Sequence, residues 1–194
     1  MQNDYNKLIK DLYSDPNMYI NEFQDYKDDI YFWPQILKDY NPKTLIEIGC
    51  GTGRVAKLVA PLVKKYTGLD FSKEFIKYFK ENNKSIIMKN NINLVNQDMK
   101  AIHINYKYDM IILPFNVFVY LYTNEDVKRF FSGIEKISKK NTIVIIDLAN
   151  NHDDDLLNID YRLCNEFIDN NNIIKLYEKH YYDVENKIIN YALS

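Results

Sequence analysis

The sequence predicts an α/β protein with a Rossmann-like, mostly parallel sheet flanked by helices and a C-terminal antiparallel β-meander. From residue 44 onward, short β-branched or apolar runs alternate with amphipathic stretches, the pattern of a parallel sheet covered by helices. Three glycines, at positions 49, 51 and 53, follow the first apolar run and precede a helical stretch. After residue 147 the alternation stops, and turn signals separate three further strand-like runs.

The strands of the parallel sheet are expected where apolar and β-branched residues cluster. We place them at residues 44–48, 66–69, 92–95, 108–113 and 142–147. The runs are short and mostly apolar, which is typical of strands buried on both faces.

The helices between these strands are expected at residues 53–63, 72–82 and 125–137. Ser72 is placed to cap the second helix, and Thr123 or Asn124 the third. Before residue 44, two polar and aromatic helical segments are expected at 4–13 and 20–40, the second interrupted near Pro34. We expect them to cover one edge of the sheet.

A chain of 194 residues with 46% hydrophobic residues can bury one good core, so a single domain over residues 1–194 is predicted. Its parts are an N-terminal helical cover (1–40), a cofactor-binding core (41–150) and the β-meander (151–194).

Composition excludes several classes of partner. The net charge of −2 gives no basic footprint for nucleic acid and no cationic face for a membrane. Two cysteines make no disulfide framework, the polar start does not resemble a signal peptide, and no apolar run could span a bilayer. We therefore expect a cytoplasmic protein that acts on a small molecule.

The glycine-rich stretch "LIEIGCGTGR" places backbone without Cβ atoms at the carboxyl edge of the sheet, where a ligand can approach closely. Glu47 stands two residues before the first glycine, and a carboxylate there would repel a pyrophosphate. It would suit a ligand with an ammonium or sulfonium charge. This favours S-adenosylmethionine over a nicotinamide dinucleotide.

Acidic residues follow the next two strands. Asp70 in "GLDFS" can accept from both hydroxyls of a ribose, and Phe71 can lie against an adenine ring. In "NQDM", Asp98 could accept from the adenine amino group, and Met99 offers a backbone N–H.

Together with "YDMIILPFNVFVYL", these motifs resemble those of class I S-adenosylmethionine-dependent methyltransferases of the small-molecule type, over residues 40–150. The resemblance implies that the methionyl part of the cofactor is held by Glu47, Gly49, Gly51 and Gly53. It implies that the ribose is held by Asp70 and that adenine is contacted by Phe71, Asp98 and Met99, with Leu113 ending the fourth strand of the site. "LYSD", at 12–15, resembles a short motif near the start of many small-molecule members.

The acceptor atom, a nitrogen or an oxygen, is left open by the sequence. Nucleic-acid amino methyltransferases usually carry an Asn/Asp-Pro-Pro-aromatic segment after the fourth strand, whereas this chain has "LPFNVFVYL". The candidate pocket residues are Phe115, Asn116, Phe118 and Tyr120.

A general base is needed only if the acceptor arrives protonated. The weak catalytic candidates are Asn116, Tyr120 and His180, with His103 and His152 behind them. Three aspartates at 153–155 lack further ligands at a defined spacing, so no metal site is predicted.

Two other functions stay open on the sequence alone: an NAD(P)-dependent oxidoreductase and a non-catalytic cofactor-binding protein. The C-terminal strands, expected at 161–168, 173–183 and 187–193, would form a lid over the acceptor site, with the family's closing helix and hairpin missing. The apolar side of the fifth strand would then need cover from the meander or from a second subunit in a homodimer. The alternative is a meander that joins the main sheet.

Overall fold

The computed structural model describes residues 14–23, 25–149, 159–169, 172–183, 185 and 188–193. Residues 26–148 form one compact unit, and residues 1–25 with 149–194 form a second. The helix expected at 4–13 lies outside the described residues. The prediction of one domain over the whole chain stays a prediction.

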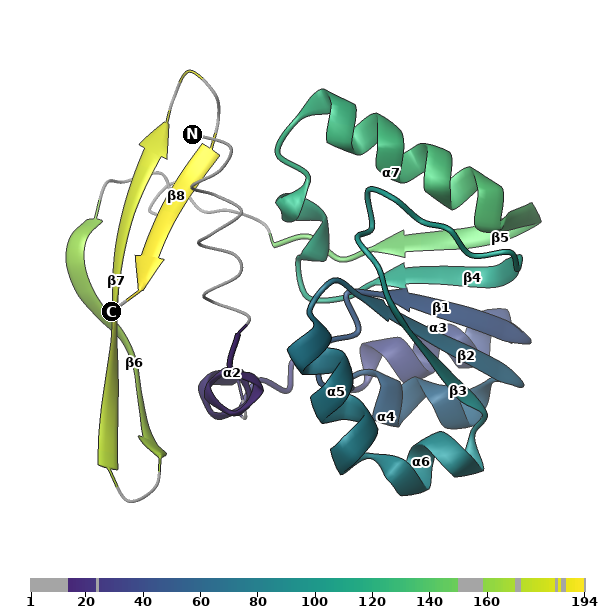
Figure 1. Ribbon diagram of the computed structural model, residues 1–194, viewed down its shortest axis with the longest axis horizontal. Helices are drawn as coiled ribbons and strands as arrows, with labels where there is room; N and C mark the ends of the chain where they lie inside the picture. The colour runs from purple at the N-terminus through teal and green to yellow at the C-terminus, as the bar shows by residue number, and fades with distance from the viewer. Residues whose placement is uncertain are drawn as a thin grey trace. The chain divides into compact units, whose positions relative to one another are not determined.

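A five-stranded parallel sheet forms the centre of residues 26–148, with the strand order β3-β2-β1-β4-β5 (Figure 1). Its strands are β1 (Thr44–Ile48), β2 (Lys65–Asp70), β3 (Ile92–Asn96), β4 (Tyr108–Leu113) and β5 (Ser138–Ile146). All five expected strands are present. β5 begins earlier than expected because the helix before it passes directly into the strand at Ser138.

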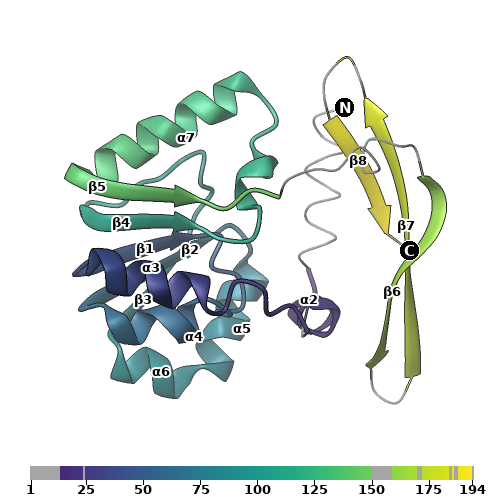
Figure 2. The ribbon, with the colours of Figure 1, turned by 180° about the vertical axis from the view of Figure 1, so that it is seen from behind.

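Helices cover both faces of this sheet. Figures 1 and 2 show α3 (Phe32–Tyr40), α4 (Ala56–Val59) and α5 (Lys73–Asn82) on one face and α7 (Asn124–Ile137) on the other. Alternate residues of β1 serve the two layers: Leu45 packs with the first group, and Ile46 and Ile48 pack with α7. The expected Rossmann-like architecture is therefore confirmed.

The helix caps agree with the sequence in detail. The Ser72 hydroxyl accepts from the N–H of Phe75 at 3.1 Å, and the Thr123 hydroxyl accepts from the N–H of Asp126 at 3.0 Å. Thr123, and not Asn124, is thus the cap of α7. The short helix α6 (Lys84–Lys89) was not expected.

Two helical boundaries differ from the sequence prediction. The helix expected at 53–63 begins only at Ala56, because Gly53 has a φ of 89° and cannot start a right-handed helix. It continues as the 3₁₀ turn η1 (Ala60–Leu62), in which Pro61 supplies no N–H.

The break expected near Pro34 lies elsewhere. The structure has two helices, α2 (Pro16–Phe23) and α3, and residues 25–31 between them are not helical. Pro34 sits in the first turn of α3, where its missing N–H costs no hydrogen bond. α3 also covers a face of the sheet and not an edge, since Trp33 and Leu37 are buried against Leu45 and the α4 region.

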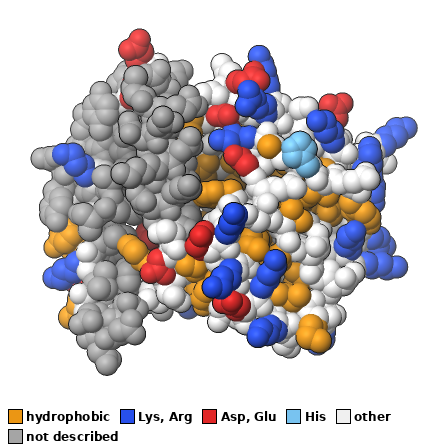
Figure 3. Space-filling model, viewed as in Figure 1, with side chains coloured by type: hydrophobic (Ala, Val, Ile, Leu, Met, Phe, Trp, Pro, Cys, Tyr) orange, Lys and Arg blue, Asp and Glu red, His pale blue; other side chains and the backbone are white. Residues whose placement is uncertain are grey.

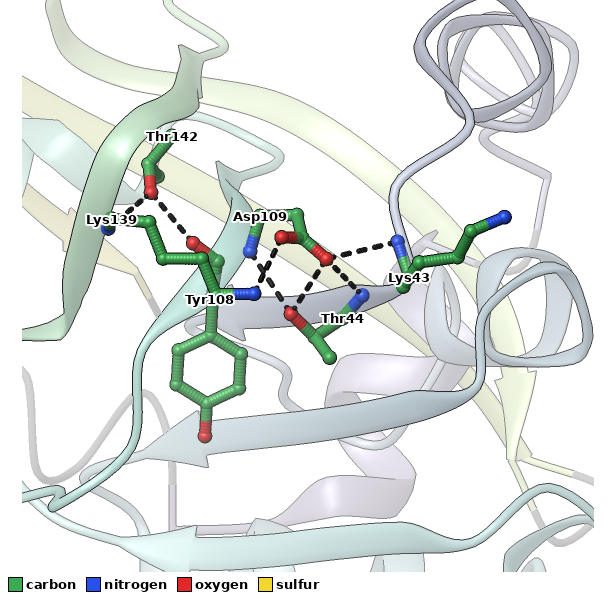
Figure 4. Close-up of polar contacts among 6 residues, drawn as sticks. All are labelled: Lys43, Thr44, Tyr108, Asp109, Lys139 and Thr142. Atoms are coloured by element: carbon green, nitrogen blue, oxygen red, sulfur yellow. Dashed lines mark hydrogen bonds and ion pairs between the residues drawn. The ribbon is translucent and has the colours of Figure 1, made fainter.

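A hydrogen-bond network centred on Asp109 ties three strands together at the amino end of the sheet (Figure 4). One carboxylate oxygen accepts from the N–H of Lys43 and from the N–H and hydroxyl of Thr44, at 2.9–3.0 Å. The other oxygen accepts from Lys139 Nζ at 2.5 Å. Burial raises the pKa of Asp109, but the bonds from Lys139 and Thr44 outweigh it and leave that pKa below its usual value. This network fixes the register of β1, β4 and β5 away from their carboxyl ends.

The C-terminal strands are antiparallel, as expected, and pair in the order β6-β7-β8. They are β6 (Ile159–Asp169), β7 (Asn172–Asp183) and β8 (Ile188–Leu193). Within the described parts of the chain they form a sheet of their own, and no ladder joins them to β5. The alternative in which β7 extends the main sheet is therefore wrong, whereas the lid role stays a prediction.

Candidate functional site

The order of the strands identifies one edge of the sheet as the place for a ligand. From β1 the chain moves outward through β2 and β3, then returns to the other side of β1 with β4 and β5. In open α/β sheets the crevice for a ligand lies at the carboxyl ends of the strands, where this order reverses. Here that point lies between the loop after β1, residues 49–53, and the turn after β4, residues 114–117.

The three glycines of the loop have different roles. All three have positive φ, at 75°, 52° and 89° for Gly49, Gly51 and Gly53. A Cβ on Gly49 would lie 2.5 Å from the side chain of Val117, and one on Gly53 would lie 2.7 Å from the ring of Phe79. A Cβ on Gly51 would meet only the Phe75 ring, at 3.7 Å. The outer glycines are required by packing, whereas a Cβ on Gly51 would make only an ordinary van der Waals contact.

Glu47 is buried on the sheet face that carries α4, with 2% of its surface exposed. Its carboxyl accepts from the hydroxyl of Tyr66 at 2.5 Å. Burial raises the pKa of Glu47 to about 8, although the Tyr66 bond and the charge of Arg54 oppose the rise. A cationic ligand nearby would favour the ionised form.

Asp70 ends β2 and is 6% exposed. One oxygen accepts from the N–H of Gly51 at 2.8 Å and the other from the N–H of Ser72 at 2.9 Å. Burial raises the pKa of Asp70 to about 6 against the effect of these bonds. Asp70 and Gly51, 19 positions apart, are thus joined directly at the carboxyl edge.

Asn96 is a site residue that the sequence prediction missed. Its Nδ2 donates to the carbonyls of Asp70 and Phe71, at 2.9 and 2.8 Å, and so fixes the backbone that carries both. Its position at the end of β3 was the available signal.

The predicted adenine contacts differ in exposure. Phe71 is 45% exposed, as a stacking surface requires. Asp98 is exposed and accepts from the N–H of Lys100 at 2.8 Å, whereas Met99 packs partly against the α7 side of the core. Leu113 is fully buried, so only its backbone could meet a ligand, and its carbonyl accepts from the N–H of Asp147. The ligand roles of these four residues stay predictions.

The turn after β4 has an unusual backbone. Phe115 and Asn116 have φ values of 59° and 60°, and two successive non-glycine residues in this region are rare. Asp147, at the end of β5, accepts from the N–H of Phe115 at 2.8 Å. Among the other pocket candidates, Phe118 packs against Phe130 of α7, which is a core role, and Tyr120 is half-buried.

The structure describes few of the histidines and aspartates that were considered as catalytic or metal-binding candidates. The residues 152–155 and the side chain of His180 lie outside what the structure describes, and His103 is exposed on the loop after β3. In the described ranges, no group of three or more His, Cys, Asp and Glu side chains could hold a metal ion. None of the described helices is long and apolar enough to cross a membrane.

Asp70→Ala is expected to weaken S-adenosylmethionine binding by about 1–3 kcal/mol, because two ribose hydroxyls lose their charged acceptor. Isothermal titration measures the change. Asp109→Asn, at the opposite edge of the sheet, is the matched control and should leave the affinity unaltered. Wild-type affinity in Asp70→Ala would rule out the ribose assignment.

A family comparison covers this site. Residues 45–141 match the family model described as a methyltransferase domain. In sequence, the chain is 29% identical over 119 residues to the ribosomal RNA small subunit methyltransferase A of Wigglesworthia glossinidia brevipalpis. The match covers 60% of this chain and 44% of that relative, so the chain spans less than half of the relative's length.

Solved structures share the fold. A S-adenosylmethionine-dependent methyltransferase from Clostridium acetobutylicum superposes with a TM-score of 0.71 at 18% identity, over 98% of this chain and 79% of that one. CalS10, an amino pentose methyltransferase from Micromonospora echinaspora solved with S-adenosylmethionine, gives a TM-score of 0.65 at 10% identity, over 86% and 74%. The predicted class I fold is confirmed by these structures. The match to the methyltransferase domain family supports S-adenosylmethionine as the cofactor.

Proposed function

The chain belongs to the methyltransferase domain family, and we propose that it transfers the methyl group of S-adenosylmethionine to a nitrogen or oxygen atom of a small molecule. The observation that carries the proposal is the arrangement around Gly51. A Cβ on this glycine would come no closer than 3.7 Å to the Phe75 ring, its N–H donates to the buried carboxylate of Asp70, and the buried Glu47 is the last but one residue of the strand before it.

This arrangement fits the chemical groups of the cofactor. A ribose offers two hydroxyl donors to Asp70, the exposed ring of Phe71 offers a face for adenine, and Glu47 supplies negative charge toward an ammonium or sulfonium. A nicotinamide dinucleotide fits less well, because its pyrophosphate would lie beside the same carboxyl groups.

Methyl transfer asks little of the protein beyond positioning. When bound, S-adenosylmethionine supplies a methyl group already activated by the sulfonium. The chain's task is to hold an acceptor lone pair in line with that methyl, which can contribute much of the acceleration. The turn at Phe115 and Asn116 lies beside the glycine loop, with the side chain of Val117 close to Gly49, and is the proposed acceptor side. If the acceptor is an amine cation, Asp147 or solvent must take its proton first.

A small-molecule acceptor is favoured by the likeness to CalS10, an amino pentose methyltransferase. The acidic balance of the chain, −2 overall, favours a neutral or cationic acceptor over a polyanion. An amino sugar is therefore the first acceptor class to test. The assay is formation of S-adenosylhomocysteine from S-adenosylmethionine with a panel of amino sugars, simple amines and phenols. No turnover with any member would argue for a cofactor-binding protein without transferase activity.

RNA is the second candidate acceptor. One relative is named as a ribosomal RNA methyltransferase, and a groove between the loop after β3 and α7 is lined by basic side chains. The lining includes Lys100, His103, Lys128, Arg129 and Lys136. Figure 3 shows basic side chains beside a histidine, with acidic ones on the same face. Because Arg129 pairs with Glu125 and Lys100 lies 3.7 Å from Asp98, part of this charge is already neutralised.

We expect no salt-dependent binding to RNA or DNA. A duplex and a single strand of about 20 nucleotides are titrated at 50 and 150 mM salt, since phosphate-driven affinity falls steeply between such concentrations. Micromolar affinity at the higher salt would overturn the small-molecule assignment. In that case Lys128→Glu with Lys136→Glu should abolish the binding and identify the groove as the contact surface.

A further inference from the structure

Arg54, directly after the last glycine of the loop, is held by an acid from a distant part of the chain. Its two terminal nitrogens bind the two carboxylate oxygens of Asp29, at 2.5 and 2.9 Å. Asp29 is 7% exposed and also accepts from Nε1 of the fully buried Trp33 at 3.0 Å. A bidentate pair of this kind is directional, and Lys cannot reproduce it.

The same guanidinium lies against two aromatic rings. Its central carbon is 5.1 Å from the ring centroid of Tyr26 and 5.1 Å from that of Phe115. The two rings meet edge to face with centroids 4.8 Å apart. Arg54 therefore joins three segments that are far apart in sequence: residues 26–33, the glycine loop and the turn after β4.

The turn after β4 needs such support. Phe115 and Asn116 both adopt the left-handed region, which costs a residue such as phenylalanine about 1–2 kcal/mol and asparagine less. The backbone of the turn is held by Asp147, which accepts from the N–H of Phe115. The ring of the same residue is held by Arg54 and Tyr26. Phe115 is thus fixed through both its main chain and its side chain.

We propose that Arg54 is a positioning residue, which locks the Phe115–Asn116 turn in its left-handed conformation against the glycine loop and so sets the acceptor side of the crevice. The proposal rests on the proposed function in one respect, that an acceptor binds at this turn. Arg54 acts through Phe115 and touches neither substrate in this role. Its guanidinium is already engaged by Asp29, which distinguishes it from a group that recognises the cofactor directly.

Amide hydrogen exchange of residues 113–121 measures how firmly this turn is held. The experiment uses the full chain and needs no acceptor. Arg54→Met removes the ion pair and the cationic contact with the rings, and the exchange rate of this segment should rise at least tenfold. Arg54→Lys keeps the charge but not the two-point pairing, so an intermediate rise is expected. Asp29→Asn should act like Arg54→Met.

Arg129→Met is the matched control, because Arg129 forms an exposed pair with Glu125 on α7 at 3.2 Å. It should leave exchange at 113–121 unchanged. The single tryptophan of the chain reports whether the Arg54–Asp29 pair is broken, because Trp33 donates to Asp29. Its emission should change in the Arg54 and Asp29 variants and stay unchanged in Arg129→Met. Unchanged exchange in Arg54→Met, or an equal rise across β1 and α5, would overturn the proposal.

The KM values for the two substrates distinguish a role of Arg54 in positioning the turn from a general loss of structure. With an acceptor that the wild-type chain methylates, Arg54→Lys should raise the KM for the acceptor at least fivefold and leave the KM for S-adenosylmethionine within twofold. An equal effect on both constants would contradict an acceptor-side role. If the wild-type chain methylates nothing, the proposed function fails, while the exchange result still decides whether Arg54 holds the turn.

Discussion

Gly51→Val should abolish S-adenosylmethionine binding, at least a hundredfold loss, while the protein stays folded. The reason is the contrast among the three glycines. A Cβ at Gly51 would lie 3.7 Å from the Phe75 ring and so meets no close protein atom, and we expect the two methyl groups of valine to occupy the proposed ligand space. The φ of 52° adds a cost of about 1–2 kcal/mol for a residue other than glycine, which lowers stability without unfolding the chain.

Two control variants separate the effect of filling the ligand space from the effect of backbone strain. Gly51→Asn tolerates the left-handed region better than valine and still fills the space, so it should also bind weakly. Gly53→Ala places a Cβ 2.7 Å from the Phe79 ring and should mainly lower the melting temperature. Titration calorimetry gives the affinities, and circular dichroism gives the melting curves. Wild-type affinity in Gly51→Val would mean that the cofactor does not lie on this loop.

The parts of the fold that were predictable are those encoded locally. An apolar run that enters "GCGTG" defines β1 and its loop from adjacent residues, and "LDFS" defines the end of β2 and the cap of α5 in the same way. The joining of Asp70 to Gly51 follows from the parallel pairing of β1 with β2, which brings their carboxyl ends to one edge.

The parts that were missed depend on contacts between distant residues. Nothing local to Asp29 indicates that it pairs with Arg54, 25 positions away. Asp147 was placed at a strand end, but its bond to Phe115 requires the pairing of β4 with β5. The left-handed turn at Phe115 and Asn116 contains no glycine, so the local sequence does not indicate it.

Glu47 connects ligand binding with the free energy of unfolding. Its carboxyl would attract a cationic ligand, but without the ligand this buried group is costly to ionise. Burial raises the pKa of Glu47 from 4.5 to about 8. Between these values the folded protein holds a proton that the unfolded chain has lost. The free energy of unfolding of the ligand-free protein should therefore decrease, through this group, as the pH rises from about 5 to 8.

Glu47→Gln should remove this cost of ionisation and weaken cofactor binding. Glutamine has the shape of the protonated carboxyl and keeps an oxygen for Tyr66, so the variant should gain up to roughly 4 kcal/mol over the wild type at pH 8, and little at pH 5. The gain is read from denaturant unfolding at the two pH values. An equal difference at both would show that Glu47 does not hold its proton in the folded state.

The same variant should lose about 2 kcal/mol of S-adenosylmethionine affinity at pH 8, close to thirtyfold, because the ligand's positive charge loses its buried counter-charge. In the wild type, a cationic ligand shifts Glu47 toward its ionised form, so binding releases a proton and strengthens as the pH rises from 6 to 8. Titrations in two buffers of different ionisation enthalpy count that proton. S-adenosylhomocysteine, which keeps the ammonium but lacks the sulfonium charge, shows which of the two charges Glu47 senses. A variant that binds S-adenosylmethionine as tightly as the wild type, with the same pH profile, would place Glu47 outside the site and leave its buried charge without a functional explanation.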